Sequence, residues 1–367
     1  MKKQLFRTLV AIGVLSAMMA FGACTEKENV TTDDSINNNI EDAISVETPR
    51  SIIMGSDGNL YITAYYPRSV ARYDLTKKAI TAICELGDYQ PEGLAEVNGK
   101  IYVASGYITD ENSNILYDNK LYVVDINSFE VVESITVGRN PSKVKKLDDN
   151  HIVFNTLGDY GNDMGGLWIM DVTTKDITKL DIMLYNFDVY DGTIYGYTNI
   201  YGSEPLGFYR IDGTSLESTA MGIDWNASDN PYGIAVNPYN GDIIITTDGN
   251  YTAKGDCYVY NSDSYLRTGS IQAGNFPSKI VALNNDELLV LNEGAWGANN
   301  ASVSKVNVAA GTAVNDFFDR ANGRGLGDVA QDILLDGNKA YITVSFSNSI
   351  ETMDATTGSS TRYATAK

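Results

Sequence analysis

Histidine and cysteine are scarce in this sequence, which removes several kinds of active site. The 367 residues include one histidine, His151, and three cysteines. Ser-His-Asp and Cys-His catalytic groups and histidine-rich metal sites all need imidazoles. His151 opens an apolar segment, where a surface or strand-edge position is expected. We therefore predict that the protein is not an enzyme and holds neither a metal ion nor a cofactor.

Positive charge is also in short supply. The sequence has 27 lysine and arginine residues against 47 aspartate and glutamate residues, a formal net charge of -20. A surface this acidic repels nucleic acid and anionic lipid headgroups, so neither is expected as a partner. The alternative explanation, that the acidic residues serve solubility alone, accounts for much of the net charge. A glycine-rich phosphate-binding loop between a strand and a helix is missing as well.

Two pairs of acidic residues keep an enzymatic alternative open. Asp159 with Asp163, or Glu293 with Asp248, are expected on one face and could flank a glycosidic bond or hold calcium. No calcium-loop motif accompanies them, and glycine and asparagine surround them. Solvated loop positions are the favoured interpretation.

Long hydrophobic runs are absent except near the N-terminus. Lys2, Lys3 and Arg7 precede an apolar stretch that ends in Gly22-Ala23-Cys24. This stretch is shorter than the roughly 20 residues of a membrane span, and residues 1–23 read as a signal peptide. Cys24 would become the lipidated first residue, although an ordinary secretory signal is the alternative. Residues 24–43 are polar and predict a flexible tether. We therefore expect the protein to contact the membrane only through its lipid anchor.

Beyond residue 43 one sequence motif repeats at a regular interval. Each copy has a turn, an apolar strand, a Gly or Asn turn, a strand with an Ile-Tyr-like pair, and a strand ending in Asp or Asn. The copies start at Pro49, Pro91, Pro141, Asn186, Pro231, Pro277 and Asp328. Their mean spacing of roughly 46 residues matches a four-stranded propeller blade. We predict an all-β domain over 44–367, a seven-bladed β-propeller, with a β-solenoid as the alternative.

The third strand of each copy carries a second signal. It ends in a carboxylate or an amide at Asp74, Asp125, Asp171, Asp212, Asn261, Asn307 and Asp354. Such a side chain can cap the following turn through its backbone. The remaining cysteines, Cys84 and Cys257, fall in the first and fifth copies and are predicted to be buried free thiols.

Aromatic residues gather after the second strand of every copy, where propeller loops open on one face. They are Tyr65, Tyr107, Tyr160, Tyr201, Tyr251, Trp296 and Phe346. Packing between blades is the plain alternative for each ring. Together with amide and guanidinium groups they predict a ligand-binding bowl. The predicted polar contacts are Asn292, Asn322, Arg324 and Asn348.

Several short sequence segments resemble those of known propeller families. Pro91–Leu94, Val137–Pro141 and Pro231–Pro238 resemble the YncE-like and surface-layer-like propeller proteins. Leu291–Gly294, followed by Phe318–Gly323 and Leu326–Gln331, resembles a signature of propeller lipoproteins from gut Bacteroidetes. That group includes surface-exposed proteins that bind cobalamin, a corrinoid, and pass it to a TonB-dependent outer-membrane transporter.

The resemblance implies a propeller with a lipid anchor, exposed on the outer membrane at the cell surface. It further implies a corrinoid as the transported ligand and a TonB-dependent transporter as the partner. A corrin is broad, mostly uncharged and fringed with amides, which suits an aromatic bowl. Glycan capture or adhesion by the same face is the alternative, because aromatic platforms also stack on sugars.

Overall fold

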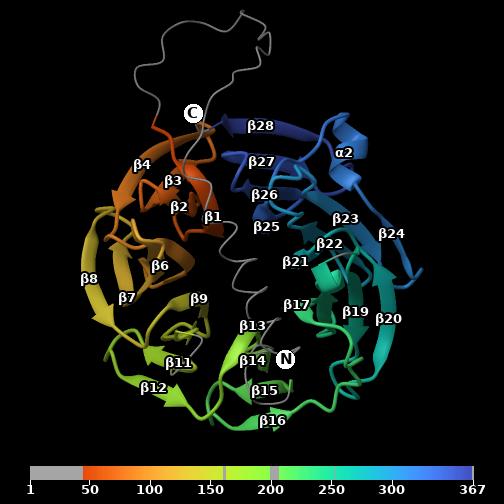
Figure 1. The fold of residues 1–367 in the computed structure, drawn as a ribbon, viewed down its shortest axis with the longest axis horizontal. Helices are drawn as coiled ribbons and strands as arrows, with labels where there is room; N and C mark the ends of the chain where they lie inside the picture. Colours follow the sequence, from red (N-terminus) through yellow and green to blue (C-terminus); the bar gives the residue numbers. More distant parts are fainter. Residues whose placement is uncertain (1–43, 160–162, 199–205, 252, 366–367) are drawn as a thin grey trace, which may run out of the picture.

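The computed structural model describes residues 44–159, 163–198, 206–251 and 253–365. The predicted signal peptide, tether and lipidated Cys24 lie outside these ranges. Within them the chain forms seven four-stranded antiparallel sheets arranged as the blades of a ring (Figure 1). The seven-bladed β-propeller predicted from the repeat is therefore confirmed.

Each blade takes four consecutive strands. Blade one contains β1 (Glu47–Met54), β2 (Leu60–Tyr66), β3 (Ser69–Asp74) and β4 (Ala79–Glu85). Blade two contains β5 (Pro91–Val97), β6 (Lys100–Thr109), β7 (Ile115–Asp125) and β8 (Val131–Thr136). Blade three contains β9 (Pro141–Lys146), β10 (His151–Thr156), β11 (Gly166–Asp171) and β12 (Ile177–Leu180). Blade four contains β13 (Leu184–Tyr190), β14 (Thr193–Thr198), β15 (Phe208–Asp212) and β16 (Ser218–Ala220).

The later blades follow the same order. Blade five contains β17 (Pro231–Val236), β18 (Ile243–Thr247), β19 (Asp256–Tyr260) and β20 (Arg267–Gln272), with the short 3-10 helix η1 (Gly249–Tyr251) before β19. Blade six contains β21 (Pro277–Ala282), β22 (Glu287–Asn292), β23 (Ser302–Asn307) and β24 (Thr312–Val314). Blade seven contains β25 (Ala330–Asp336), β26 (Lys339–Val344), β27 (Ser349–Asp354) and β28 (Ser360–Thr365), preceded by helix α2 (Phe317–Asn322).

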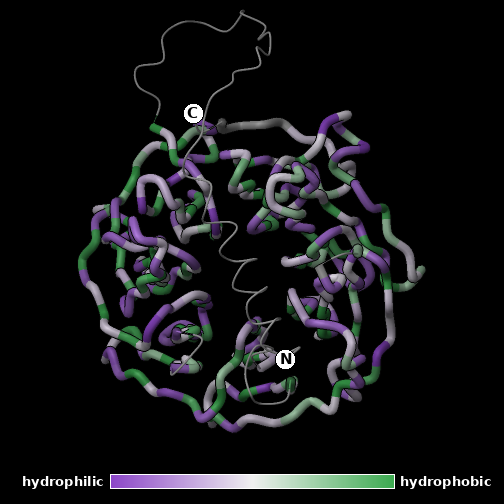
Figure 2. Tube along the Cα trace, in the orientation of Figure 1, coloured by the Kyte–Doolittle hydropathy of each residue, from purple (hydrophilic) through white to green (hydrophobic). Residues whose placement is uncertain are grey.

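The hydrophobic core is divided among the interfaces between blades. One cluster joins blades three and four through Val153, Phe187 and Ile194, and an equivalent cluster lies between every other neighbouring pair. The second strands sit between two such clusters, and β18 is buried along its whole length. The outermost strands are open to solvent, as in β16. Figure 2 shows hydrophobic and hydrophilic residues alternating within the blades, which is the two-residue period of a strand.

The ring closes without a shared strand. Blade one uses only residues near the N-terminal end of the domain, and blade seven only those at its C-terminal end. Side chains bridge the seam: the Ser345 hydroxyl donates to the Pro49 carbonyl at 2.6 Å, and the Thr343 hydroxyl to the Arg50 carbonyl at 2.5 Å. Hydroxyl groups at the same place join blades one and two, where Thr63 donates to the Glu92 carbonyl.

The turns after the third strands are capped as predicted. Asp74 accepts the backbone N–H groups of Thr76 and Lys77, five other blades repeat this pattern, and in blade six Asn307 accepts the N–H of Ala310. The N–H groups stabilise the ionised carboxylate and lower the pKa of Asp74 and Asp171. The repeated Asp or Asn is therefore a feature of the scaffold.

Every inner strand carries a register shift near its start, after Pro49 in β1 and after the first residue in the other six. Such a bulge turns two successive side chains toward the same side of the strand. In blades two and five the second of these positions is Gly93 or Gly233, where a Cβ would come within 2.7 Å of a carbonyl oxygen of the next blade. The bulges therefore bring polar side chains to the axis and let neighbouring inner strands approach closely.

Both remaining cysteines are buried and unpaired, as predicted. Burial raises the pKa of the Cys84 thiol to about 11 and that of Cys257 to about 12, so both stay protonated. Among the described residues, no helix has the length and apolar character needed to span a membrane.

Candidate functional site

One face of the ring collects the segments that lead into each blade and the loops after the second strands. The register places Glu47 of β1 opposite Tyr66 of β2, so the start of the first strand and the end of the second lie together. The same holds in blade six, where Pro277 pairs with Asn292. We call this side the loop face. The sequence predicted that the loops after the second strands open on one face of the propeller, and the loop face agrees with this.

At the loop face a group of polar and aromatic side chains surrounds the axis. We call it the mouth cluster. It consists of Arg50, Tyr65, Glu92, Tyr107, Tyr232, Glu293 and Gln331.

On one side of the mouth cluster, Arg50 is the central residue. Its guanidinium donates to Glu92 Oε2 at 3.2 Å and lies 5.0 Å from the centre of the Tyr65 ring. The Tyr65 hydroxyl donates to the other oxygen of Glu92 at 2.6 Å. Burial acts to lower the pKa of Arg50, but Tyr65 and Glu92 outweigh it and raise the pKa above the usual value. Arg50 therefore stays charged, and the Glu92 carboxylate lies within hydrogen-bonding distance of its guanidinium.

On the other side, Glu293 is held by two donors. The Tyr232 hydroxyl donates to one of its carboxylate oxygens and the Gln331 amide to the other, each at 2.5 Å. These residues come from blades five, six and seven, so Glu293 ties three blades together. Burial also raises the pKa of Tyr107 to about 12, with Glu92 adding to the effect, so its hydroxyl remains a donor. The mouth cluster offers carboxylates beside phenol hydroxyls.

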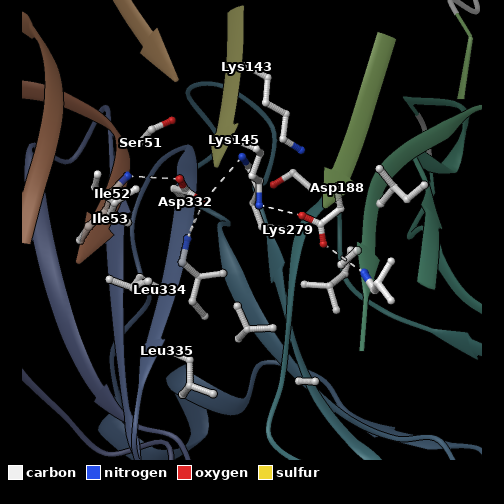
Figure 3. Close-up of a pocket in the computed structure, with 18 of the residues that line it drawn as sticks. Ser51, Ile52, Ile53, Lys143, Lys145, Asp188, Lys279, Asp332, Leu334 and Leu335 are labelled. Atoms are coloured by element: carbon white, nitrogen blue, oxygen red, sulfur yellow. Dashed lines mark hydrogen bonds and ion pairs between the residues drawn. The ribbon is translucent and has the colours of Figure 1, made fainter. Parts of the chain in front are cut away.

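Below the mouth cluster, a cavity of about 480 Å³ runs along the axis and is lined by the inner strands. We call its charged residues the channel cluster: Lys143, Lys145, Asp188, Lys279 and Asp332. Figure 3 shows them pointing into the cavity from β9, β13, β21 and β25. Lys145 pairs with Asp188 at 2.8 Å, whereas Lys279 lies 3.6 Å from Asp332. Protein surrounds these side chains, yet Lys145 keeps 43% of its side-chain surface open to the channel.

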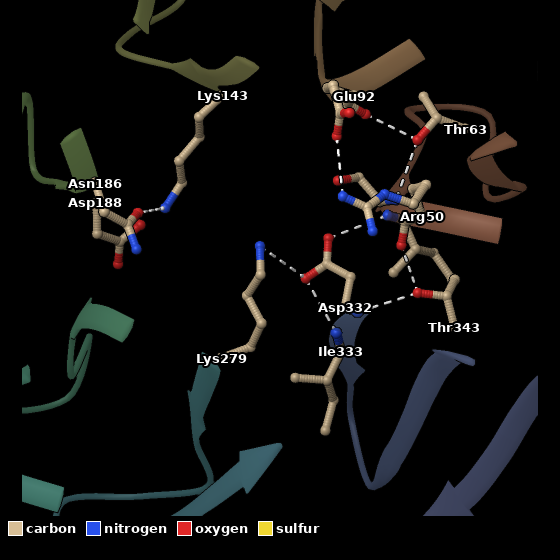
Figure 4. A network of polar contacts seen from close by, with 12 residues as sticks. Arg50, Thr63, Glu92, Lys143, Asn186, Asp188, Lys279, Asp332, Ile333 and Thr343 are labelled. Atoms are coloured by element: carbon tan, nitrogen blue, oxygen red, sulfur yellow. Dashed lines mark hydrogen bonds and ion pairs between the residues drawn. The ribbon is translucent and has the colours of Figure 1, made fainter. Parts of the chain in front are cut away.

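Lys143 has a different environment from the other two lysines. Its ammonium donates to the amide oxygen of Asn186 at 2.8 Å (Figure 4), and no ion pair involves it in the described ranges. Burial lowers the pKa of Lys143 well below its usual value, and the positive charges of Lys145 and Lys279 lower it further. The opposite holds for Lys145, because Asp188 raises its pKa.

The predicted aromatic bowl is only partly assembled. Tyr65 and Tyr107 belong to the mouth cluster, although Tyr107 lies within the long strand β6, paired with Tyr117, and not in a loop. Trp296 and Phe346 lie edge to face, 6.2 Å between ring centres, with 44% and 46% of their surfaces exposed. For Tyr251 only the backbone, at the end of η1, is described. Tyr160 and Tyr201 lie outside the described residues.

The polar residues predicted to accompany the rings bind within the protein. Asn292 is fully buried and donates to the hydroxyls of Ser302 and Ser304. Asn322 joins α2 to blade seven by donating to the Phe318 and Gly358 carbonyls. These two amides stabilise the scaffold, so we leave them out of the candidate site.

Arg324 and Asn348 are engaged in the same way. Arg324 forms two hydrogen bonds, of 3.0 and 2.7 Å, to the fully buried carboxylate of Glu351. The Asn348 side chain accepts the backbone N–H of Thr48 at 2.8 Å, across the seam of the ring. Both side chains therefore help to hold the scaffold, and each keeps N–H donors that these bonds do not use.

Of the two acidic pairs considered for catalysis, Asp159 and Asp163 share one loop, and Asp248 and Glu293 belong to separate networks. Asp159 pairs with Arg139 at 2.8 Å and accepts the backbone N–H of Asp163. Asp248 accepts from Asn230 and from the Asn250 backbone, whereas Glu293 belongs to the mouth cluster. In the described ranges no group of three or more His, Cys, Asp or Glu residues is placed to hold a metal ion. His151 sits at the start of β10 beside Asp148.

Sequence reasoning missed Arg50, Glu92 and the three lysines. Each lies one to four residues after the start of an inner strand, at positions that flank a buried apolar residue such as Val144. In a propeller the inner strands line the axis, so charged residues at these positions point to a polar channel. These charged residues near the starts of the repeat copies are visible in the sequence.

Comparison with known proteins supports the fold. No protein-family model and no curated protein sequence matches the chain. Among solved structures, hydrazine synthase from Kuenenia stuttgartiensis matches 88% of this chain and 100% of its own, with a TM-score of 0.61 and 16% identity. Virginiamycin B lyase from Staphylococcus aureus matches 81% of this chain and 91% of its own, with a TM-score of 0.55 and 14% identity.

A third similar structure is the dihydro-heme d1 dehydrogenase NirN in complex with DHE. It matches 86% of this chain and 66% of its own, with a TM-score of 0.55 and 14% identity. At these identities the three likenesses establish the propeller fold and carry no information on ligands or activity.

Proposed function

We propose that the protein is a surface-exposed lipoprotein that captures a corrinoid, cobalamin above all, on its loop face and passes it to a TonB-dependent outer-membrane transporter. The observation that supports this best is the exposed pair of Trp296 and Phe346 on the same face as the mouth cluster. Large exposed rings that are not covered by the protein's own chain are typical of binding surfaces.

The chemistry of the loop face suits a broad ligand edged with amides. Aromatic contacts contribute roughly 0.5–1.5 kcal/mol per good pair beyond burial of area. Glu92 and Glu293 each offer carboxylate oxygens with lone pairs beyond those already used, and amide N–H groups of a ligand can donate to them. Rings and carboxylates together recognise both the flat surface and the polar rim.

Delivery to a transporter depends on the N-terminal segment and on the family resemblance. A lipid on Cys24 would keep the propeller at the membrane, and the tether would let the loop face approach a neighbouring protein. No catalytic step is part of the proposal.

Titration calorimetry with cyanocobalamin tests the proposal. We expect one-to-one binding, and a Trp296→Ala, Phe346→Ala double variant should lose at least tenfold in affinity without loss of thermal stability. Tyr239→Ala is the matched control, because Tyr239 is 57% exposed near the opposite end of the channel. Absence of binding by the unaltered protein would refute corrinoid capture.

Glycan capture is the second candidate, and the exposed Trp296 beside the carboxylates of the mouth cluster favours it equally. Indole rings stack on sugar faces while carboxylates accept hydroxyl donors. Visible absorbance separates the two candidates, because a bound corrinoid colours the purified protein and a glycan does not. A colourless protein that binds an oligosaccharide, with binding lost in the same double variant, would support the glycan candidate.

A further inference from the structure

The channel cluster has more positive than negative charge. It contains three lysines and two aspartates, a surplus of one positive charge (3 - 2 = 1) in a protein whose net charge is -20. Enclosing cations together is unfavourable unless other groups compensate for them. The surplus therefore marks the channel as a place where negative charge would be stabilised.

The two aspartates are fixed by the backbone and cannot turn to serve a third lysine. Asp188 accepts the backbone N–H of Val236 in blade five at 3.1 Å. Asp332 accepts the N–H of Ile52 across the seam at 3.2 Å, and its other oxygen accepts the N–H of Ile333. Each aspartate thus links inner strands of the ring, and the lysine ammonium groups are the adjustable members of the cluster.

Unused hydrogen-bonding capacity lies at the same place. Lys143 donates to one amide oxygen, which leaves two of its three N–H donors. The hydroxyl of Ser278 lines the cavity and is buried with no hydrogen-bond partner in the described part of the chain. Buried polar groups are normally satisfied, so an orphaned hydroxyl in the lining of a cavity that also holds spare ammonium donors indicates a missing acceptor.

We propose that the central channel binds an oxyanion, a phosphate or carboxylate group, held by Lys143 and Lys279 with the Ser278 hydroxyl as an additional donor. This site is separate from the loop face and goes beyond the proposed capture function. Lysine is suited to the role because its ammonium is a compact charge with three donors on a flexible stem. The loose 3.6 Å contact of Lys279 with Asp332 leaves that lysine able to turn toward the anion.

The protonation of Lys143 provides a second line of support. The charged groups that face it are Lys145, Lys279, Asp188 and Asp332, and burial together with the two lysines lowers its pKa. A bound anion would favour the protonated form of Lys143. Binding should therefore be accompanied by proton uptake at alkaline pH.

Calorimetric titration of the purified protein at low ionic strength, with inorganic phosphate and separately with malonate, tests the site. We expect saturable binding of at least one of the two, and the stronger binder identifies the preferred oxyanion. Lys143→Met should weaken this binding tenfold or more. Repeating the titration near pH 9 in two buffers of different ionisation enthalpy should reveal proton uptake that the variant lacks.

Lys146→Met is the matched control, because Lys146 is the last residue of the same strand and pairs with Asp149 at the surface. It should change affinity by less than twofold. Lys143→Met removes no partner of a carboxylate, so its melting temperature should not fall and the comparison stays interpretable. Cyanocobalamin binding at the loop face should persist in Lys143→Met, which separates the two proposals.

Two results would overturn the channel site. One is the absence of saturable phosphate or malonate binding at tens of millimolar in low salt. The other is equal weakening in Lys143→Met and Lys146→Met, since a loss shared by a surface lysine reflects general charge attraction.

Discussion

The mouth cluster and the channel cluster lie on the same axis but treat charge in opposite ways. At the mouth, Arg50 is paired with Glu92, and Glu293 is held by two neutral donors. Farther in, Lys143 faces two other lysines, donates to an amide and lies 5.4 Å from the centre of the Phe187 ring. The difference teaches that polar residues lining a propeller axis serve two purposes: matched groups stabilise the ring, and unmatched groups are available to a ligand.

The largest effect is expected where the carboxylate of a matched pair is completely buried, as in Glu351. Arg324→Met would leave the fully buried carboxylate of Glu351 without its guanidinium partner. We expect a loss of about 3 kcal/mol in the free energy of unfolding, because an unpaired buried charge is costly. Urea unfolding measures it, with Arg320→Met on the exposed side of α2 as the control. Wild-type stability together with loss of ligand binding would return Arg324 to the candidate site.

A smaller effect is expected at the mouth, where water reaches the pair. Glu92→Gln removes the charge opposite Arg50 and should cost about 2 kcal/mol of unfolding free energy, less than the loss of the partner of the fully buried Glu351. The exposed Glu111→Gln serves as the control in the same urea series. If Glu92→Gln is as stable as its control, the distinction between matched and unmatched charge fails at the mouth.

The smallest effect concerns the pH dependence of stability in the channel. The pKa of Lys143 is lower in the folded protein than in the unfolded chain, mainly through burial. Between the two pKa values the unfolded chain binds more protons, so this residue makes stability rise with pH up to the usual lysine range. Lys143→Met should therefore be stabilised relative to wild type at pH 7, and the gain should shrink by pH 10.

Urea unfolding at the two pH values checks this, and adding phosphate sharpens it. Phosphate should stabilise the wild type more than the Lys143→Met variant, because a ligand stabilises only the state that binds it. A gain from Lys143→Met that grows between pH 7 and pH 10 would contradict the direction of the pKa shift.

The repeat made most of the fold predictable. The second strands and the capping residues at the ends of the third strands occur as expected, because a two-residue period and an Asp turn are local signals. The inner strand starts two residues away from the predicted entry point in three blades, at Glu47 for Pro49, at Leu184 for Asn186 and at Ala330 for Asp328. In the other four blades the inner strand starts at the predicted proline.

The site was less predictable than the fold. A sequence shows that Asn292 and Arg324 can donate hydrogen bonds, but not that Ser302, Ser304 and Glu351 already occupy them. Conversely, Lys143 and Lys279 are 136 positions apart, and only the closure of the ring brings them to one cavity. Exposed rings such as Trp296 were easier to find, because loops after the second strand reach the surface in any propeller.

The seam without a shared strand has a consequence for how the domain forms. Its closing hydrogen bonds join residues 293 and 296 positions apart, whereas other blades meet neighbours a few tens of residues away. Its core is also the smallest of the seven between blades in the described chain, with six fully buried apolar residues. Contacts this distant in sequence cost the most chain entropy to establish. Folding should therefore proceed as an open crescent of docked blades, in which the first and last blades meet only after the intervening five have assembled.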